Sequence, residues 1–327
     1  MHPSDTAEIG TTGLRVTRLG LGGVALSGAP PATNPQATTA EAEALRLVHR
    51  SLELGVRYFD TAPMYGLGQS ERRVGQGLSG IDRESYVLST KVGRVLDLIE
   101  TGSTQMQWSF DFSRHGAQRS FRESLERLGL ERVDILFIHD PDNHYLQALT
   151  QAFPVLMELR AQGLVQAIGA GMNQWEMELR FAKEGDFDCF LLAGRYTLLE
   201  QTSLAEFLPY CVEKKISVIA GGPYNSGILA ADNLTAAATY NYRESPPAII
   251  EKAQRIKAVC DRHNVPMRAA ALQFILAHPA IASVIPGARS ATELEENFTL
   301  VKHPIPAAFW AELKAEQLIV ANAPTPS

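Results

Sequence analysis

Apolar residues along the chain follow two spacings, one typical of buried strands and one typical of amphipathic helices. Helical spacing is clearest in residues 114–128, which end at Gly129, a helix-stop residue. Strands are predicted at 18–23, 57–62, 85–92, 133–139, 164–171, 188–196, 216–221 and 281–285. Helices are predicted at 40–54, 69–79, 114–128, 145–161, 174–184, 203–214, 248–263, 267–277, 291–301 and 306–320.

Strands that alternate with helices form parallel sheets with right-handed crossovers. Eight such units favour a single closed (β/α)8 TIM barrel over an open doubly wound sheet, whose G-x-G-x-x-G fingerprint is absent after the first strand. Residues 9–16 predict an N-terminal β-hairpin cap, and extra helices follow the last strand. Residues 93–112 and 222–247 are expected to be irregular loops. No linker divides residues 1–327, so we expect one domain.

Composition narrows the functional class. The net charge is −6 with both signs interspersed, which argues against a nucleic-acid binder. No apolar run reaches 18 residues, and the first ten residues lack signal-peptide features, so we expect a cytoplasmic protein that does not enter a membrane. Cys189, Cys211 and Cys260 lack the short spacings of metal or disulfide sites. The sequence does not indicate the oligomeric state.

Polar residues stand at the ends of three consecutive predicted strands. Asp60, Lys91 and His139 end the second, third and fourth strands, and Tyr65 lies in the loop after Asp60. Parallel neighbours lie about 5 Å apart, and functional residues of such barrels lie at the carboxyl ends of strands. These side chains can therefore meet at one rim, where Asp60 needs a cation such as Lys91 if it is buried. The same pair could also be purely structural.

The four residues suit proton transfer to or from a carbonyl oxygen. A phenol has a pKa of about 10, which a neighbouring cation lowers, so Lys91 would activate Tyr65 as general acid or base. His139 would orient the substrate oxygen. No side chain here can carry a hydride, so a redox reaction would need a cofactor. A metal cluster of His139, Asp140 and nearby residues is disfavoured, because no second group of ligands is evident, and no metal is expected.

Longer segments resemble the aldo-keto reductase family over nearly the whole chain. The resemblance rests on residues 59–66, 89–92, 124–129 with 138–139, and 285–289 with 296–297. It implies a (β/α)8 barrel that binds NAD(P) without a Rossmann domain. The family's tetrad falls on Asp60, Tyr65, Lys91 and His139.

Departures from the family pattern point to one branch. The usual Ser-Asn after the fifth strand is Met172-Asn173, and the aromatic that stacks on nicotinamide is replaced by Gly221, so Arg195 or Tyr224 would rebuild that pocket. This combination resembles the aldose 1-dehydrogenases (L-fucose, D-threo-aldose, L-galactose) and the pyridoxal 4-dehydrogenases. The resemblance places cofactor contacts at Gly22, Gly23, Met172, Asn173, Arg195, Gly221, Gly222, Pro223, Gly227, Leu229, Ile285, Gly287, Arg289, Glu293, Glu296 and Asn297.

The last strand's loop bears on which cofactor is used. Gly287 and Glu293 occupy positions that are often basic in members using NADP. A carboxylate would repel the 2′-phosphate and could accept hydrogen bonds from a ribose 2′-hydroxyl, which favours NAD, although Arg289 could still reach a phosphate. Glu293 could alternatively be only an acid at a helix N-terminus.

The resulting hypothesis is an NAD-dependent enzyme that oxidises the anomeric carbon of an aldose to a lactone. Alternatives are a pyridoxal 4-dehydrogenase, a general NADPH-dependent aldehyde or ketone reductase, and a non-catalytic module like the channel β-subunits. The expected partner is a small sugar, aldehyde or alcohol. Trp108, Tyr145 and Tyr224 are candidates for stacking on it.

Overall fold

The apolar runs form one parallel sheet that closes on itself. The computed structural model describes residues 2–28, 40–100, 103, 105–231, 234, 239–241 and 243–326. The bridges Leu19–Val284 and Gly22–Gly287 join the first and last strands of an eight-stranded sheet, which confirms the predicted TIM barrel. In spatial order the strands are β3 (Leu21–Gly22), β4 (Tyr58–Asp60), β5 (Val87–Val92), β8 (Ile135–His139), β9 (Ala167–Met172), β10 (Cys189–Ala193), β11 (Ser217–Gly221) and β14 (Ile281–Ile285).

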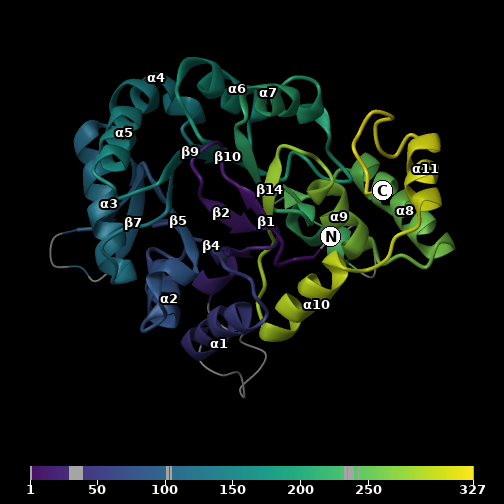
Figure 1. Ribbon diagram of the computed structural model, residues 1–327, viewed down its shortest axis with the longest axis horizontal. Coiled ribbons are helices and arrows are strands. Elements are labelled where there is room, and N and C mark those ends of the chain that lie inside the picture. The colour runs from purple at the N-terminus through teal and green to yellow at the C-terminus, as the bar shows by residue number, and fades with distance from the viewer. Residues whose placement is uncertain are drawn as a thin grey trace.

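Helices surround the sheet as a ring (Figure 1). The predicted helix at 145–161 is interrupted, because Pro154 cannot donate a helical hydrogen bond, and residues Ala148–Ala152 form a π-turn. The predicted helix at 203–214 starts only at Phe207, and the tail helix ends at Ala315 rather than 320. The helices are α1 (Ala40–Glu53), α2 (Gln69–Leu78), α3 (Arg114–Leu128), α4 (Tyr145–Gln147), α5 (Phe153–Ala161), α6 (Trp175–Glu184), α7 (Phe207–Lys214), α8 (Pro247–Arg262), α9 (Met267–Leu276), α10 (Ala291–Val301) and α11 (Ala307–Ala315).

The N-terminal hairpin closes one end of the barrel. Strands β1 (Thr6–Glu8) and β2 (Arg15–Thr17) pair antiparallel, and Figure 1 shows them in the middle of the helical ring. Ile9, Leu14 and Val16 pack into a core cluster with inward residues of β4, β5, β8, β9, β10, β11 and β14. The Ser217 hydroxyl, at the start of β11, donates to the Glu8 carbonyl at 2.9 Å, so the hairpin seals the end where strands begin.

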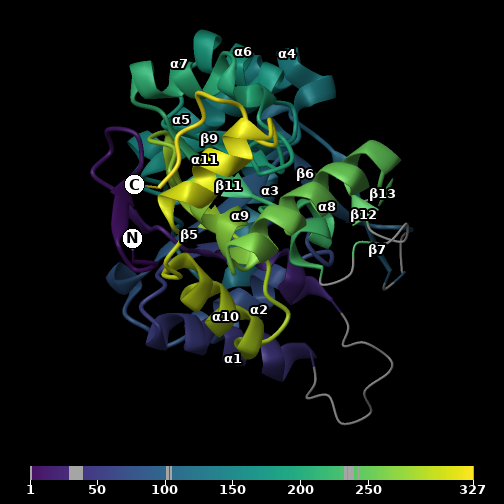
Figure 2. The same cartoon turned by 90° about the vertical axis from the view of Figure 1, so that its right-hand side faces the viewer.

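Two segments expected to be irregular contain regular structure, so that expectation was wrong. Residues 93–112 contain an antiparallel pair, β6 (Arg94–Leu98) with β7 (Met106–Phe110). The segment 222–247 contains a 3₁₀ helix, Asn225–Ala230, and the short strands β12 (Thr239–Tyr240) and β13 (Arg243–Glu244). Both pairs form locally after barrel strands, and Figure 2 shows them on the side opposite the N-terminal hairpin. They therefore belong to the open rim.

The helices and the cysteines also bear on what class of protein this is. The described helices include none with the length and apolarity needed to span a bilayer. Cys189, Cys211 and Cys260 are buried and free.

The seal at the closed end predicts a specific loss of stability. Ile9 is fully buried beneath the barrel, so Ile9→Ala should lower the free energy of unfolding by about 2–5 kcal/mol, measured by urea titration. Ile99, half-exposed beyond β6, is the matched control, and Ile99→Ala should cost less than about 0.5 kcal/mol. A loss in Ile9→Ala as small as that expected for Ile99→Ala would mean that the hairpin is not part of the cooperative core.

Candidate active site

A buried ion pair lies at the centre of the open rim. The Lys91 Nζ donates to both carboxylate oxygens of Asp60, at 2.9 and 2.8 Å, and to the Thr61 carbonyl at 2.8 Å. Ser89 also donates to Asp60, at 2.7 Å. Register explains the pairing, because Asp60 lies opposite Ser89 and Lys91 points inward one pleat further along β5. Desolvation lowers the pKa of Lys91, but the fields of Asp60 and Tyr65 together exceed it, so the net pKa is raised and Lys91 is a cation.

Tyr65 lies directly above this cation. The Lys91 Nζ is 4.7 Å from the centre of the Tyr65 ring, and tight turns with positive φ at Gly66 and Gly68 fold the loop back over the rim. Burial raises the pKa of Tyr65 to about 12, while Lys91 acts in the opposite direction. The expectation of a net lowered pKa was therefore wrong, because desolvation of the phenolate outweighs the cation. Tyr65 is a neutral phenol at physiological pH.

His139 completes the group at the end of β8. Its ring stands edge-on to Tyr65, with the ring centres 5.8 Å apart. Burial, reinforced by the charges of Lys91 and Arg94, holds the pKa of His139 well below 6.5. Its Nδ1 is buried and has no hydrogen-bond partner among the described residues. The imidazole is therefore neutral and can donate one hydrogen bond without bringing a positive charge to the rim.

Amide side chains join the ends of the next three strands. Asn173, just after β9, donates to the Ala193 carbonyl at 2.7 Å, and Asn225 donates to the Gly194 carbonyl at 3.1 Å. Gly194 and Gly222 both have positive φ, which lets the backbone turn sharply there. Within the described structure, the Asn225 Oδ1 is buried without a hydrogen-bond partner. Gly194 and Asn225 were not predicted from the sequence, although Asn225 directly follows Tyr224, a residue predicted to help form the nicotinamide pocket.

Glycines keep the backbone close where the barrel closes. A Cβ on Gly22 would lie 2.9 Å from the Ile285 carbonyl oxygen, and one on Gly23 would lie 2.5 Å from that of Asp60. Gly287, which bridges Gly22, has open space around it, with Ala25 Cβ as the nearest atom at 3.7 Å. Gly22 and Gly23 are buried and let the closing strands pack tightly, whereas Gly287 is exposed, so a flat or phosphate-bearing ligand can approach the backbone closely at Gly287.

Helix α10 starts with a pair of opposite charges. Arg289 donates to Glu293 through its backbone N–H at 2.9 Å and through two guanidinium nitrogens at 3.2 and 3.0 Å. Ser290 caps the helix by accepting from the Glu293 backbone N–H. Glu293 thus serves as a helix N-terminal acid and also holds Arg289, whose side chain is 82% exposed.

Tyr224 points toward α10 rather than toward the tetrad. Its hydroxyl donates to the Asn297 carboxamide oxygen at 2.6 Å, and Arg268 lies over its ring and pairs with Glu296 at 2.7 Å. Arg195 donates to Asn241 at 3.0 Å, beside the loop after β11. Of the other predicted contact residues, the buried ones are Met172, Gly221, Pro223, Leu229 and Ile285, and Gly222 and Gly227 are exposed in the loop after β11.

The aromatic candidates separate clearly. Tyr145 is buried in the core, where its ring packs 4.6 Å from Phe181 and lies under Arg180, so nothing in its placement supports stacking on a substrate. Trp108 on β7 is 38% exposed and lies over the guanidinium of Arg94, 4.3 Å from the ring centre. Arg94 was not predicted as a site residue from the sequence. The feature that pointed to it was a charged residue three positions after Lys91.

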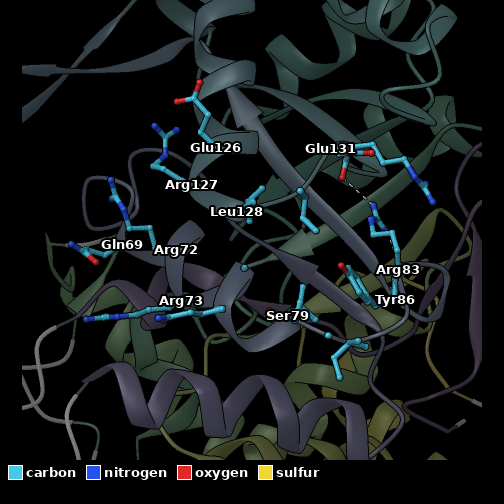
Figure 3. A pocket seen from close by; sticks show the side chains of 18 of the residues that line it. Gln69, Arg72, Arg73, Ser79, Arg83, Tyr86, Glu126, Arg127, Leu128 and Glu131 are labelled. Atoms are coloured by element: carbon cyan, nitrogen blue, oxygen red, sulfur yellow. Dashed lines mark hydrogen bonds between the residues drawn. The ribbon is translucent and has the colours of Figure 1, made fainter.

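A groove of about 900 Å³ lies elsewhere, on the outer ring between α2 and α3. Figure 3 shows its arginines, among them Arg72, Arg83 and Arg127. Arg127 pairs with Glu71 at 2.6 Å and Arg83 with Asp134 at 2.8 Å, and no tetrad residue lines the groove. Across the described ranges, no three His, Cys, Asp or Glu side chains are grouped so as to hold a metal ion.

Comparison with known proteins gives a consistent result. Residues 18–317 match the Aldo/keto reductase family. The chain is 39% identical to D-threo-aldose 1-dehydrogenase of Pseudomonas sp over 300 residues (87% of this chain, 89% of the relative). It is 38% identical to pyridoxal 4-dehydrogenase of Microbacterium luteolum over 347 residues (98% and 99%). The holo form of an aldo-keto reductase from Bacillus halodurans superposes with a TM-score of 0.77 at 26% identity, covering 98% of this chain and 97% of that one.

The neutral state of His139 predicts a pH dependence of stability. Because the pKa of His139 is lower in the folded state, the unfolded chain binds the extra proton below pH 6.5, and stability falls as the pH falls. His139→Gln should remove up to about 1.4 kcal/mol per pH unit of that fall, measured by urea titrations across the acid range.

Comparing each variant with the wild type cancels the contributions of other groups. His278, buried away from the tetrad with its pKa lowered to about 4, provides a reference: His278→Asn should also flatten the curve. A His139→Gln profile parallel to that of the wild type would show that His139 is protonated in the folded protein.

Proposed function

Because this chain belongs to the aldo/keto reductase family, and is therefore an oxidoreductase, we propose that it is an NAD-dependent dehydrogenase that oxidises the anomeric carbon of an aldose to a lactone. The observation that carries the proposal is the placement of the Tyr65 phenol above the buried Lys91–Asp60 pair and beside the neutral His139. The aldose class is supported by the relative named D-threo-aldose 1-dehydrogenase.

The rim suits a nicotinamide dinucleotide, which when bound supplies the hydride acceptor that no side chain provides. The buried Asn225 Oδ1 has no partner in the described part of the chain and could accept from a carboxamide. Asn173 binds the Ala193 carbonyl, and Asn225 binds that of the next residue, Gly194. The open backbone at Gly287 leaves room for a phosphate. Gly221 stands where the family usually has an aromatic residue, so the nicotinamide ring would lie against backbone at this position and would not stack on a side chain.

The chain's own residues would handle the proton. In oxidation, the C1–H bond breaks with its electron pair leaving as hydride, the C1–O bond becomes a carbonyl, and the hydroxyl proton moves to the Oη of Tyr65 in its phenolate form. His139 donates a hydrogen bond to the same oxygen and fixes its position. Since the pKa of Tyr65 is about 12, the base form is scarce at neutral pH, and oxidation should accelerate as the pH rises. The phenol form is ready to protonate a carbonyl in the reverse direction.

The preference for NAD is supported by the charges at the start of α10. The Glu293 carboxylate holds the Arg289 guanidinium and offsets its charge. The 2′-phosphate of NADP needs a free cation but would lie close to the Glu293 carboxylate, which repels it. The ribose 2′-hydroxyl of NAD could instead donate a hydrogen bond to that carboxylate.

Oxidation of pyridoxal is the second candidate. It is supported by the 38% identity to pyridoxal 4-dehydrogenase over 98% of the chain and by the exposed Trp108 and Phe110 rings at the rim. A flat pyridine could stack on such rings.

Substrate turnover separates these candidates. The protein mixed with NAD and L-fucose, L-galactose or D-arabinose at about pH 9 should produce NADH, detected by its absorbance, and the rate should fall toward neutral pH. Turnover of pyridoxal with no response to any sugar would replace the proposal by the second candidate.

Two controls belong to that assay. Tyr65→Phe should reduce turnover on the order of 10²- to 10⁴-fold, because it removes the acid–base group without changing the ring's shape. Unchanged turnover in Tyr65→Phe would reject Tyr65 as the acid–base group. Tyr210→Phe, on the outer helix α7, should leave turnover unchanged.

Cofactor choice is tested by neutralising one carboxylate. Glu293→Gln should release Arg289 and lower the KM for NADP about tenfold, the value of one charge-assisted hydrogen bond. Glu295→Gln, two residues along the same helix and paired with Arg50, is the matched control and should leave both cofactors unaffected. An unchanged ratio of KM values for NAD and NADP in Glu293→Gln would remove Glu293 from the account of cofactor choice.

A further inference from the structure

We propose that Arg94 and Asp140, walled by Trp108, form a unit that recognises the substrate's hydroxyl group adjacent to the reacting carbon. The inference rests on the proposed aldose function and deepens it by assigning the selectivity for a 2-hydroxyl. The three residues come from two segments of the rim: Arg94 begins β6 and Trp108 is on β7 of the same hairpin, whereas Asp140 directly follows His139.

The Arg94 guanidinium is buried yet poorly supplied with acceptors. Its Nη2 pairs with the Asp140 carboxylate, and only 10% of its side chain is exposed. Its Nη1 faces the Met64 Sδ at 2.7 Å, and a thioether is a weak acceptor. Its Nε is buried with no partner among the described residues. A buried donor without an acceptor is unfavourable. An oxygen-rich ligand that reaches the Arg94 side chain would accept the hydrogen bonds that the protein does not supply and would be bound more tightly for that reason.

The Asp140 backbone is held in an unusual conformation that directs the residue toward the reaction centre. Its φ is +46°, in the left-handed region that non-glycine residues seldom adopt, and its N–H donates to the Gly171 carbonyl at 2.9 Å. The Asp140 Oδ2 lies 3.7 Å from the His139 Nε2. A hydroxyl one carbon away from the oxygen that His139 contacts would therefore reach both Asp140 and Arg94.

An aromatic wall completes the unit. The Arg94 guanidinium carbon is 4.3 Å from the Trp108 ring centre and 4.8 Å from that of Phe110, and both rings are 38% exposed. Stacking fixes the plane of the guanidinium, which is part of its hydrogen-bonding geometry. A carboxylate that accepts, a guanidinium that donates and an apolar face match the alternating hydroxyl and C–H surfaces of a sugar. A simple aldehyde has no hydroxyl group that could bind Arg94 or Asp140.

The test compares D-arabinose with 2-deoxy-D-ribose, its counterpart lacking the 2-hydroxyl, with NAD as oxidant. The wild-type enzyme should favour D-arabinose in kcat/KM. Arg94→Gln should lower kcat/KM for D-arabinose about 10- to 100-fold and change the deoxy sugar far less, so the ratio between the two sugars collapses. Arg94→Lys, which keeps the charge and loses the planar fork, should give an intermediate ratio. Asp140→Asn should reduce the same ratio.

Arg119→Gln is the matched control, because Arg119 also ties the β6–β7 hairpin, through the Leu96 carbonyl and Asp97, without facing the tetrad. It should leave the ratio unchanged. Equal losses for both sugars in Arg94→Gln would overturn the recognition unit, since a merely structural arginine affects both substrates alike. Failure of the wild type to oxidise any sugar would overturn the proposed function itself, and this inference with it.

Discussion

The buried pair of Lys91 and Asp60 is the interaction on which the site depends. Two charges enclosed by a barrel are tolerable only because each satisfies the other and because Ser89 and Thr61 supply further hydrogen bonds. Removing either partner would leave an uncompensated charge in the core. The pair also fixes the Lys91 ammonium group beneath Tyr65, whereas a solvent-exposed lysine would not be held in one position. Structure and chemistry therefore rest on the same contact.

Desolvation governs the protonation states around that pair. It raises the pKa of Tyr65 and lowers that of His139, so both groups are neutral while the ion pair beneath them stays charged. Arg94 and Asp140 add a second pair of opposite charges beside His139. The rim consequently contains strong local fields with little excess charge, which suits a neutral polyol better than an ionic substrate.

The sequence predicted the barrel because strand and helix periods alternate regularly. It singled out Asp60, Lys91 and His139 because each stands at the end of an apolar run, and the structure places these three side chains close to Tyr65. It failed where tertiary context decides the outcome. The β6–β7 pair has no alternation strong enough to distinguish it from a loop, and its strands are stabilised by contacts such as Arg94 with Trp108. The prediction for the pKa of Tyr65 was wrong because the sequence does not show how deeply a side chain is buried. Tyr145 could not be distinguished from a loop aromatic before Phe181 was seen beside it.

The β6–β7 hairpin has an evolutionary consequence. The proposed acid–base residues come from β4, β5 and β8 and their immediate ends. The proposed wall of the substrate site is a single insertion that leaves the barrel at Gly93 and returns at Asp111, where the Asp111 N–H donates to the Gly93 carbonyl at 3.0 Å. Such an insertion can be lengthened, shortened or exchanged between relatives without disturbing a barrel strand. Selectivity and catalysis can therefore diverge at different rates within one chain.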